Sequence, residues 1–315
     1  MSGSGQKGFE EHRHAAERIE IVLAFAAIYV IWGSTYLAIR FAIETVPPLM
    51  MAAVRFLIAG TLLYAWVRAR GTPAPRRDEW RATTIVGGLM LLGGNGAVVW
   101  AEQRVPSGVT ALLVALVPLW MVLLEWARRG GVRPDGRTIA GLALGLGGLA
   151  VLVGPEQVLG GGHVDHAGAV VLALGSLSWA AGSLYSRHAH LPAAPMLATA
   201  MEMLGGGVLL LLAAGARGEW PQVSLAAISL RSALSVGYLV VFGSLVAFTA
   251  YIWLLRATTP ARVSTYAYVN PVVAMLLGWA LAGEPLAPRT LLAAAIIITA
   301  VAMITLSRVR RSGSA

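Results

Sequence analysis

Two charged residues stand inside stretches that otherwise read as hydrocarbon. Arg55 lies in MMAAVRFLIAG and Glu202 lies in PMLATAMEMLGGG. A charge that faces lipid at such depth is costly, so both side chains should face the interior of a helix bundle or a wet cavity. There a guanidinium can bind a carboxylate, and a carboxylate can meet an ammonium group or a proton. The alternative is that backbone carbonyls and neighbouring polar groups satisfy both, and that the two residues only hold helices together.

Further polar and aromatic residues recur at helical spacing on other apolar stretches. Such stripes should point inward, because a lipid-facing surface gains nothing from them. A cavity lined by Trp32, Trp179 and Tyr266 would suit aromatic or apolar groups, or cations held against ring faces. The alternative for the tryptophans is a belt at the membrane interface. The candidate stripes are Trp32, Tyr36 and Arg40; Asn95 and Glu102; Ser176, Trp179 and Ser183; and Arg262, Tyr266 and Asn270.

The composition explains what kind of element must carry these residues. Of the 315 residues, 57% are hydrophobic and only 12% are charged. Soluble domains carry about 25% charged residues. The sequence therefore predicts a membrane protein that crosses the bilayer many times. Because the chain has no cysteine, disulfides, thiolate nucleophiles and cysteine metal sites are excluded.

Apolar runs long enough to cross a bilayer follow one another with short connections that carry Pro, Gly or charge. A helix needs about 20 apolar residues to span the hydrocarbon core. We expect an all-α membrane protein with ten transmembrane helices, flanked by short tails at 1–18 and 307–315. The predicted runs are 19–41, 47–68, 80–101, 105–127, 137–154, 165–186, 193–214, 226–255, 259–282 and 286–306.

The basic residues predict the orientation of these spans. With the N-terminus inside, most of the 24 Lys and Arg residues fall in the inner loops and tails, while the outer ends hold few. This distribution follows the positive-inside rule. It predicts that both termini are cytoplasmic, and it accounts for the net charge of +9 without a nucleic-acid partner.

The two halves of the chain resemble each other. WGSTYLAIR with VPPLMMAAVRFLIAG in the first half corresponds to WAAGSLYSR with LPAAPMLATAMEMLGGG in the second. The halves are 19–154 and 165–306, with five spans each. Because five is odd, the second half must cross the membrane in the opposite direction. Inverted repeats of this kind build the two access states of many secondary transporters around one midplane site.

Several motifs closely resemble the drug/metabolite transporter superfamily, EamA type, and within it the YedA-like inner-membrane exporters. They are IWGSTYLAIRFAIE, GGNGAVVWAEQRVPSG, EMLGGG and TYAYVNPVVAMLLGWALAGEPL. The resemblance covers roughly 20–306. It implies two EamA repeats, a central cavity open to one side at a time, and export of small metabolites such as amino acids. The chain departs from the family in its first-repeat loop, GVRPDGR, which lacks the acidic residue that Glu284 supplies in the second.

The functional expectation is a secondary-active exporter of small organic molecules. One arginine and one glutamate in the spans, Arg55 and Glu202, suit amino acids or other zwitterions, whereas a nucleotide cargo would need more basic residues. Efflux of drugs or organic cations is the alternative, with a membrane-embedded enzyme or a channel more remote. Walker A, HExxH and GxSxG patterns are absent from the sequence. We therefore expect no enzyme activity, cofactor or metal, and a monomer in the bilayer; coupling to a proton stays open.

Overall fold

A computed structural model of the chain describes residues 3–128, 133–153, 165–258, 263 and 265–312. Within this part the protein is a bundle of α-helices, two of which are interrupted by π-helical segments. Each of the ten predicted runs contains a helix within the described residues, as the all-α prediction requires. Residues 259–262 and 264 of the ninth run lie outside the described part. The elements are α1 (Gly3–Ala42), α2 (Pro48–Ala69), α3 (Arg77–Gly87), η1 (Gly88–Asn95), α4 (Gly96–Ala101), α5 (Ser107–Val114), α6 (Val117–Ala127), α7 (Gly136–Val153), α9 (His166–Ser186), α10 (Pro195–Ala216), α11 (Leu230–Tyr238), η4 (Leu239–Phe248), α12 (Thr249–Ala257), α14 (Tyr266–Ala282) and α15 (Pro288–Ser312).

Seven stretches of the described residues are long and apolar enough to cross a membrane. Two further helices contain shorter apolar segments, Val269–Ala282 and Pro288–Met303. The helix starts follow local sequence rules. Pro48 and Pro195 stand at the first position of α2 and α10, where a missing N–H costs nothing. The side chain of Asp165 caps α9 by accepting a hydrogen bond from the backbone of Ala167.

Three boundaries differ from the predicted runs. The first helix begins at Gly3, so that much of the predicted tail at 1–18 continues α1. The stretch EEHRHAAER is rich in good helix formers, which explains the extension. α15 likewise continues to Ser312. The run predicted at 226–255 becomes α-helical only at Leu230, after two short 3₁₀ turns.

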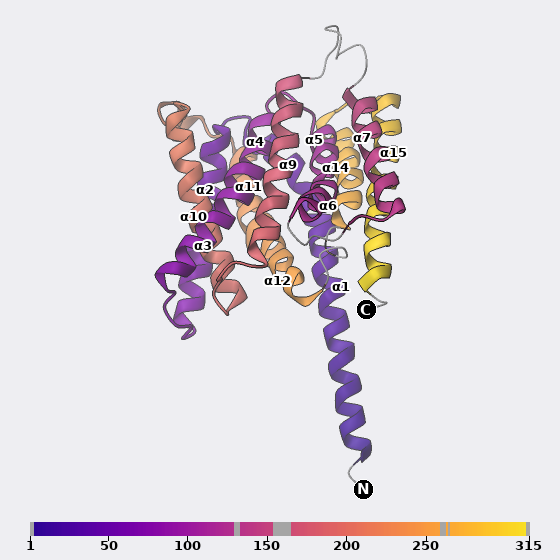
Figure 1. Cartoon of the computed structure of the whole chain (residues 1–315). Helices are drawn as coiled ribbons and strands as arrows, with labels where there is room; N and C mark the ends of the chain where they lie inside the picture. The colour runs from indigo at the N-terminus through magenta and orange to yellow at the C-terminus, as the bar shows by residue number, and fades with distance from the viewer. Residues whose placement is uncertain (1–2, 129–132, 154–164, 259–262, 264, 313–315) are drawn as a thin grey trace.

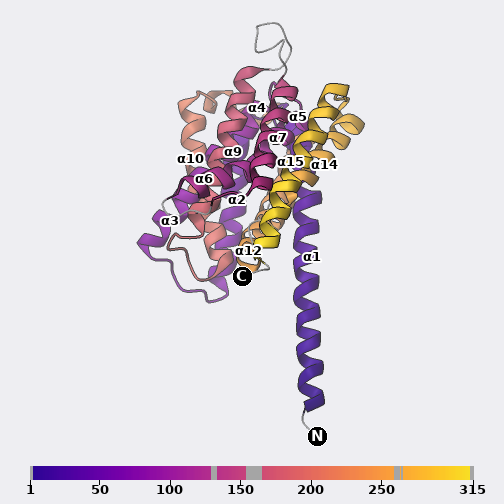
Figure 2. The same cartoon turned by 45° about the vertical axis from the view of Figure 1, so that its right-hand side comes forward.

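The direction of the helices shows the inverted relation of the two halves. In Figure 1, α1 rises from the N-terminus, whereas α9 descends from the opposite face of the bundle. Both chain ends leave the bundle on one side, here called the terminal side; the opposite side is called the far side. Figure 2 shows the start of α1 projecting from the terminal side beyond the other helices.

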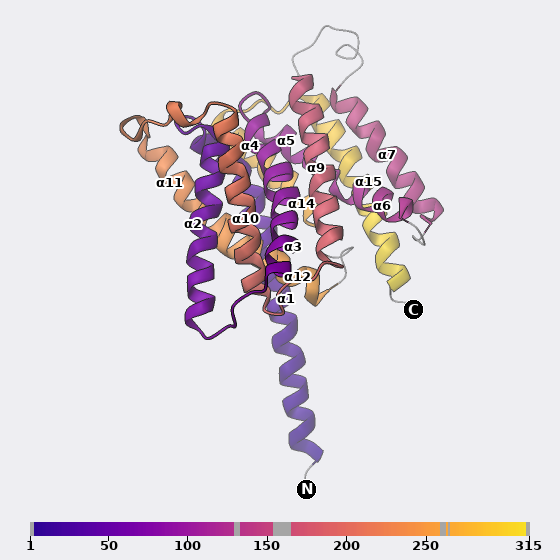
Figure 3. The same ribbon diagram turned by 60° about the vertical axis from the view of Figure 1, so that its left-hand side comes forward.

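Pairs of helices from the two halves pack against each other. α2 lies along α10, and α7 lies along α15 (Figure 3). α1 packs on α14, and α6 packs on α9. Each of these contacts joins one half to the other. Neither repeat therefore buries its apolar surface alone, and the space between them is available for a site.

The two π-helical segments occupy matching places in the two halves. η1 interrupts the third span and η4 interrupts the eighth. π-Bulges are rare and occur frequently at functional sites. Side chains satisfy carbonyls in both segments: the Trp32 indole donates to the carbonyl of Gly243 at 3.2 Å, and the Ser178 hydroxyl donates to that of Leu89 at 2.7 Å. The bundle thus holds two irregular backbone segments next to its centre.

Candidate functional site

A cavity lies at the centre of the bundle, between the two π-helical segments. The space between its lining side chains is about 660 Å³, including the part continuous with solvent. The central cavity is lined by Trp32, Thr35, Tyr36, Ile39, Arg55, Phe56, Leu91, Gly94, Asn95, Val98, Val114, Gly175, Ser176, Trp179, Gly243, Phe248, Tyr266 and Asn270.

Many of the residues predicted from the sequence meet in this cavity. Those that line it are Trp32, Tyr36, Arg55, Asn95, Ser176, Trp179, Tyr266 and Asn270. They come from α1, α2, η1, α9 and α14, so elements of both repeats contribute. The inward-facing stripes of those helices therefore converge on one space.

Among the described residues, Arg55 is the only Lys or Arg that lines the cavity, and it is held from one side. Its Nε donates to the hydroxyl of Ser244 at 2.8 Å, and its guanidinium lies 4.6 Å from the centre of the Phe56 ring. Gly243 makes room for it, because a Cβ there would stand 2.8 Å from Nη2. The Nη1 atom is buried and has no hydrogen-bond partner within the described residues. One face of the guanidinium is thus left for a ligand.

Two acceptors of the cavity are also unpartnered. The side-chain oxygens of Asn95 and Asn270 are buried and accept no hydrogen bond from any described residue. Buried polar atoms of this kind are rare and call for an explanation, such as a bound group. The lining thus combines an unused cationic donor with two unused acceptors.

Aromatic side chains gather at the end of the cavity nearer the terminal side. Trp32 contacts the rings of Trp179, Tyr251 and Tyr266, with centroid distances of 5.7, 4.9 and 5.4 Å. The hydroxyl of Tyr251 also bonds Ser183, at 3.1 Å. We call Trp32, Trp179, Tyr251 and Tyr266 the aromatic layer. Three of its four members, Trp32, Trp179 and Tyr266, also line the cavity.

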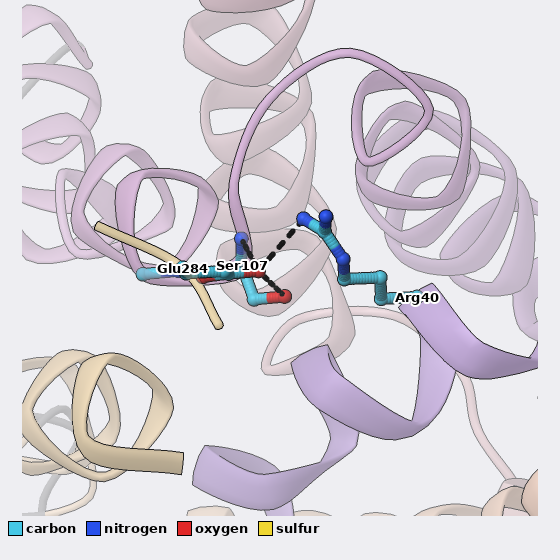
Figure 4. A network of polar contacts seen from close by, with 4 residues as sticks. Arg40, Ser107 and Glu284 are labelled. Carbon is cyan, nitrogen blue, oxygen red and sulfur yellow. Dashed lines mark hydrogen bonds and ion pairs between the residues drawn. The ribbon is translucent and has the colours of Figure 1, made fainter. Parts of the chain in front are cut away.

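The remaining predicted residues lie elsewhere. Arg40 pairs with Glu284 at 2.8 Å on the far side, where Glu284 also accepts from Ser107 (Figure 4). Glu102 is 4% exposed, and both its oxygens lack a partner in the described part of the chain.

Ser183 and Glu202 complete the set of predicted residues that the structure describes; Arg262 lies outside the described residues. Ser183 lies beside the aromatic layer, bonded to Tyr251. Glu202 lines a separate pocket on the terminal side. The two charges first considered, Arg55 and Glu202, therefore face different spaces.

Some lining residues were missing from the sequence prediction. Gly243 and Phe248 of η4, and Tyr251 of the aromatic layer, follow each other at intervals of five and three residues. A search at α-helical spacing does not find them, because a π-helix bonds from i to i+5. A further signal in the sequence was available: Gly243 and Ser244 are small residues, one of them polar, in an otherwise apolar run.

Comparisons with known proteins agree with this architecture. The sequence model of the EamA-like transporter family matches residues 19–154 and again 166–306. The chain is 44% identical over 287 residues to the inner membrane transporter YedA of Escherichia coli (strain K12), covering 90% of each protein. It is 26% identical over 276 residues to the protein PecM of Dickeya dadantii, covering 87% of this chain and 88% of that protein. A solved crystal structure with 24% identity has the same fold, with a TM-score of 0.65 over 91% of this chain and 97% of the other.

Proposed function

The chain belongs to the EamA-like transporter family, as a multi-pass inner-membrane transporter of small molecules, and we propose that it exports amino acids or related zwitterions. The transport step is alternating access through the central cavity, with both termini in the cytoplasm. The proposal treats the chain as a monomer, because the cavity is built within one chain. The observation that carries it is the set of unpartnered polar atoms in the cavity.

These atoms match the two ends of a zwitterion. The free Nη1 of Arg55 can donate to a carboxylate, and charge-assisted bonds of this kind are about twice as strong as neutral ones. The oxygens of Asn95 and Asn270 can accept from an ammonium group. The rings of Trp32 and Trp179 offer apolar surface for the remaining side chain. Each class of lining residue thus has one part of the substrate to recognise.

Inverted symmetry supports alternating access. The π-helical segments and the cross-repeat helix pairs give each half a counterpart of opposite direction. Exchange of the two halves' conformations would open the cavity to the other side of the membrane. In the conformation described here the aromatic layer lies between the cavity and the terminal side. A substrate in the cavity would then be released toward the far side.

Efflux of organic cations is a second candidate. Its support is the ring faces of Trp32, Trp179 and Tyr266, which can hold a cation. Arg55 opposes it, because a buried positive charge repels a cationic ligand. The two candidates predict opposite effects of removing that charge.

The test is counterflow of labelled phenylalanine, threonine or methionine in proteoliposomes. We expect Arg55→Ala to raise KM about 30-fold, the equivalent of losing about 2 kcal/mol from a charged hydrogen bond. Arg70→Ala is the matched control, since Arg70 follows α2 and is exposed. Amino-acid counterflow that Arg55→Ala leaves intact would overturn the zwitterion proposal. Cation transport that Arg55→Ala enhances would favour the second candidate.

A further inference from the structure

A second pocket lies on the terminal side of the aromatic layer. The space between its lining atoms is about 830 Å³, including the part continuous with solvent. It is formed by the end of α9, the segment 187–193, α10 and the end of α12. We call it the terminal-side pocket. Its charged lining residues are Arg187, Glu202 and Arg256.

Glu202 is the unexplained group of this pocket. The residue is fully buried, at 0% exposure, and neither of its carboxylate oxygens has a hydrogen-bond partner within the described residues. It stands seven residues from the first residue of α10, roughly 10 Å along the helix axis. A buried carboxylate without a partner is destabilising. Such a group within a membrane-spanning helix points to a functional role.

Arg256 faces Glu202 without bonding it. Its guanidinium donates to the backbone carbonyls of Ala193 and Pro192, at 3.3 and 3.5 Å. A positive and a negative group that line one pocket without contacting each other leave room for a ligand that carries both charges.

The two spaces follow each other along the axis of the bundle. Trp179 lines the central cavity and also donates to the hydroxyl of Tyr251, at 3.4 Å, in the aromatic layer. The neighbour of Tyr251, Ile252, lines the terminal-side pocket. The aromatic layer therefore adjoins both spaces. A molecule crossing the bundle would meet Glu202 and Arg55 on opposite sides of that layer.

We infer that the terminal-side pocket is a loading site for the transported molecule, in which Glu202 accepts the ammonium group and Arg256 attracts the carboxylate. The inference rests on the proposed function, because it assigns the same class of zwitterion to a second site. It goes beyond that function because it names a second binding site, in which Glu202 rather than Arg55 makes the main contact with the molecule. Glu202 recognises the ammonium end at the pocket, whereas Arg55 recognises the carboxylate end in the cavity.

The absence of cysteine from the chain provides a direct binding test. Ala189 lines the pocket, so an Ala189→Cys variant places one thiol at the site. Purified protein in detergent is treated with a maleimide, and the rate of labelling is measured with and without three probes. The probes are phenylalanine, phenethylamine, which keeps only the ammonium group, and phenylpropionate, which keeps only the carboxylate.

We expect phenylalanine and phenethylamine to slow the labelling of Ala189→Cys, and phenylpropionate to have little effect. Adding Glu202→Gln should raise the protecting concentration of both amines about tenfold or more, as expected for losing a charged hydrogen bond. The control thiol is Ala74→Cys, in the exposed segment between α2 and α3, which no probe should protect. Gel filtration of each variant shows whether it is folded.

The outcomes separate the inference from the proposed function. Amino-acid counterflow by the wild-type protein together with unprotected Ala189→Cys would overturn the loading site and leave the function standing. Protection that persists unchanged in Glu202→Gln would also overturn it. Protection by phenethylamine in a protein without amino-acid counterflow would keep Glu202 as an ammonium site and shift the substrate to organic cations.

Discussion

Glu284 and Glu202 are both buried glutamates between the two repeats, but only one of them is bonded. Glu284 accepts from Arg40 at 2.8 Å and from the backbone and hydroxyl of Ser107 at 3.0 and 2.9 Å. The backbone N–H of Gly108 also points to it, at 3.4 Å. No described residue bonds the carboxylate of Glu202. The same type of side chain is therefore hydrogen-bonded on the far side of the bundle and has no partner among the described residues on the terminal side.

The difference follows from what surrounds each carboxylate. Glu284 caps the N-terminus of α5, where free N–H groups and the helix dipole stabilise a negative charge. Its partners join the loop after α14 to α1 and α5, so this network ties the far side together (Figure 4). Glu202 lies within α10, where the backbone N–H groups are already used. A satisfied carboxylate is thus part of the scaffold, and an unsatisfied one remains available for a ligand.

The largest expected effect is loss of the Glu284 network. Glu284→Ala leaves Arg40 and the first N–H groups of α5 without their acceptor. Leaving several donors without their buried acceptor costs about 3 kcal/mol in total. We expect a marked fall in the thermal unfolding temperature of the purified protein. The unfolding temperature of Glu284→Gln, which keeps an acceptor oxygen, should fall less. An unfolding temperature equal to wild type in Glu284→Ala would show that the network does not stabilise the far side.

The backbone around Glu202 packs closely against Gly87, and a substitution at Gly87 tests this packing. A Cβ at Gly87 would stand 2.2 Å from the carbonyl oxygen of Glu202 and 2.8 Å from the backbone nitrogen of Gly206. Backbone cannot move aside as a flexible side chain does, so Gly87→Ala should separate α3 from α10. Overpacking typically costs about 2 kcal/mol. The measurement is again thermal unfolding, with Gly136→Ala as control because no described residue lies within 4 Å of its Cβ position. Equal stability of the two variants would contradict the close packing.

Arg40→Ala should have a smaller effect than either change. The side chain of Arg40 is 38% exposed, so water can replace part of its contact with Glu284. Glu284 also keeps its bonds to Ser107. We expect a loss of about 1 kcal/mol, the upper end for a partly exposed ion pair. The double variant Arg40→Ala/Glu284→Ala should lose less than the sum of the two, because they share one network. Strict additivity would show that Arg40 does not act through Glu284.

The sequence predicted the helices and much of the cavity, but not its irregular parts. Hydropathy and the two repeats were sufficient for the spans. Helical spacing was sufficient for Trp32, Tyr36 and Asn270, because those residues lie on regular turns. The same spacing predicted that Arg40 lies in the cavity as well. In the structure the side chain of Arg40 instead pairs with Glu284 on the far side. α-Helical spacing did not predict Gly243, Phe248 and Tyr251, because the π-helical segment changes which side chains share a face.

Glu202→Gln should have the smallest effect on stability, and it separates the two glutamates most clearly. The change removes no hydrogen bond to a described residue, and it replaces a group whose charged form is costly to bury. We expect a stability against thermal unfolding equal to that of the wild type or higher by no more than about 1 kcal/mol. The protection of Ala189→Cys by amines should be lost in the same variant. A fall as large as that of Glu284→Ala would mean that Glu202 braces the helices. Unchanged stability with lost binding would mean that α10 keeps a carboxylate there for its ligand alone.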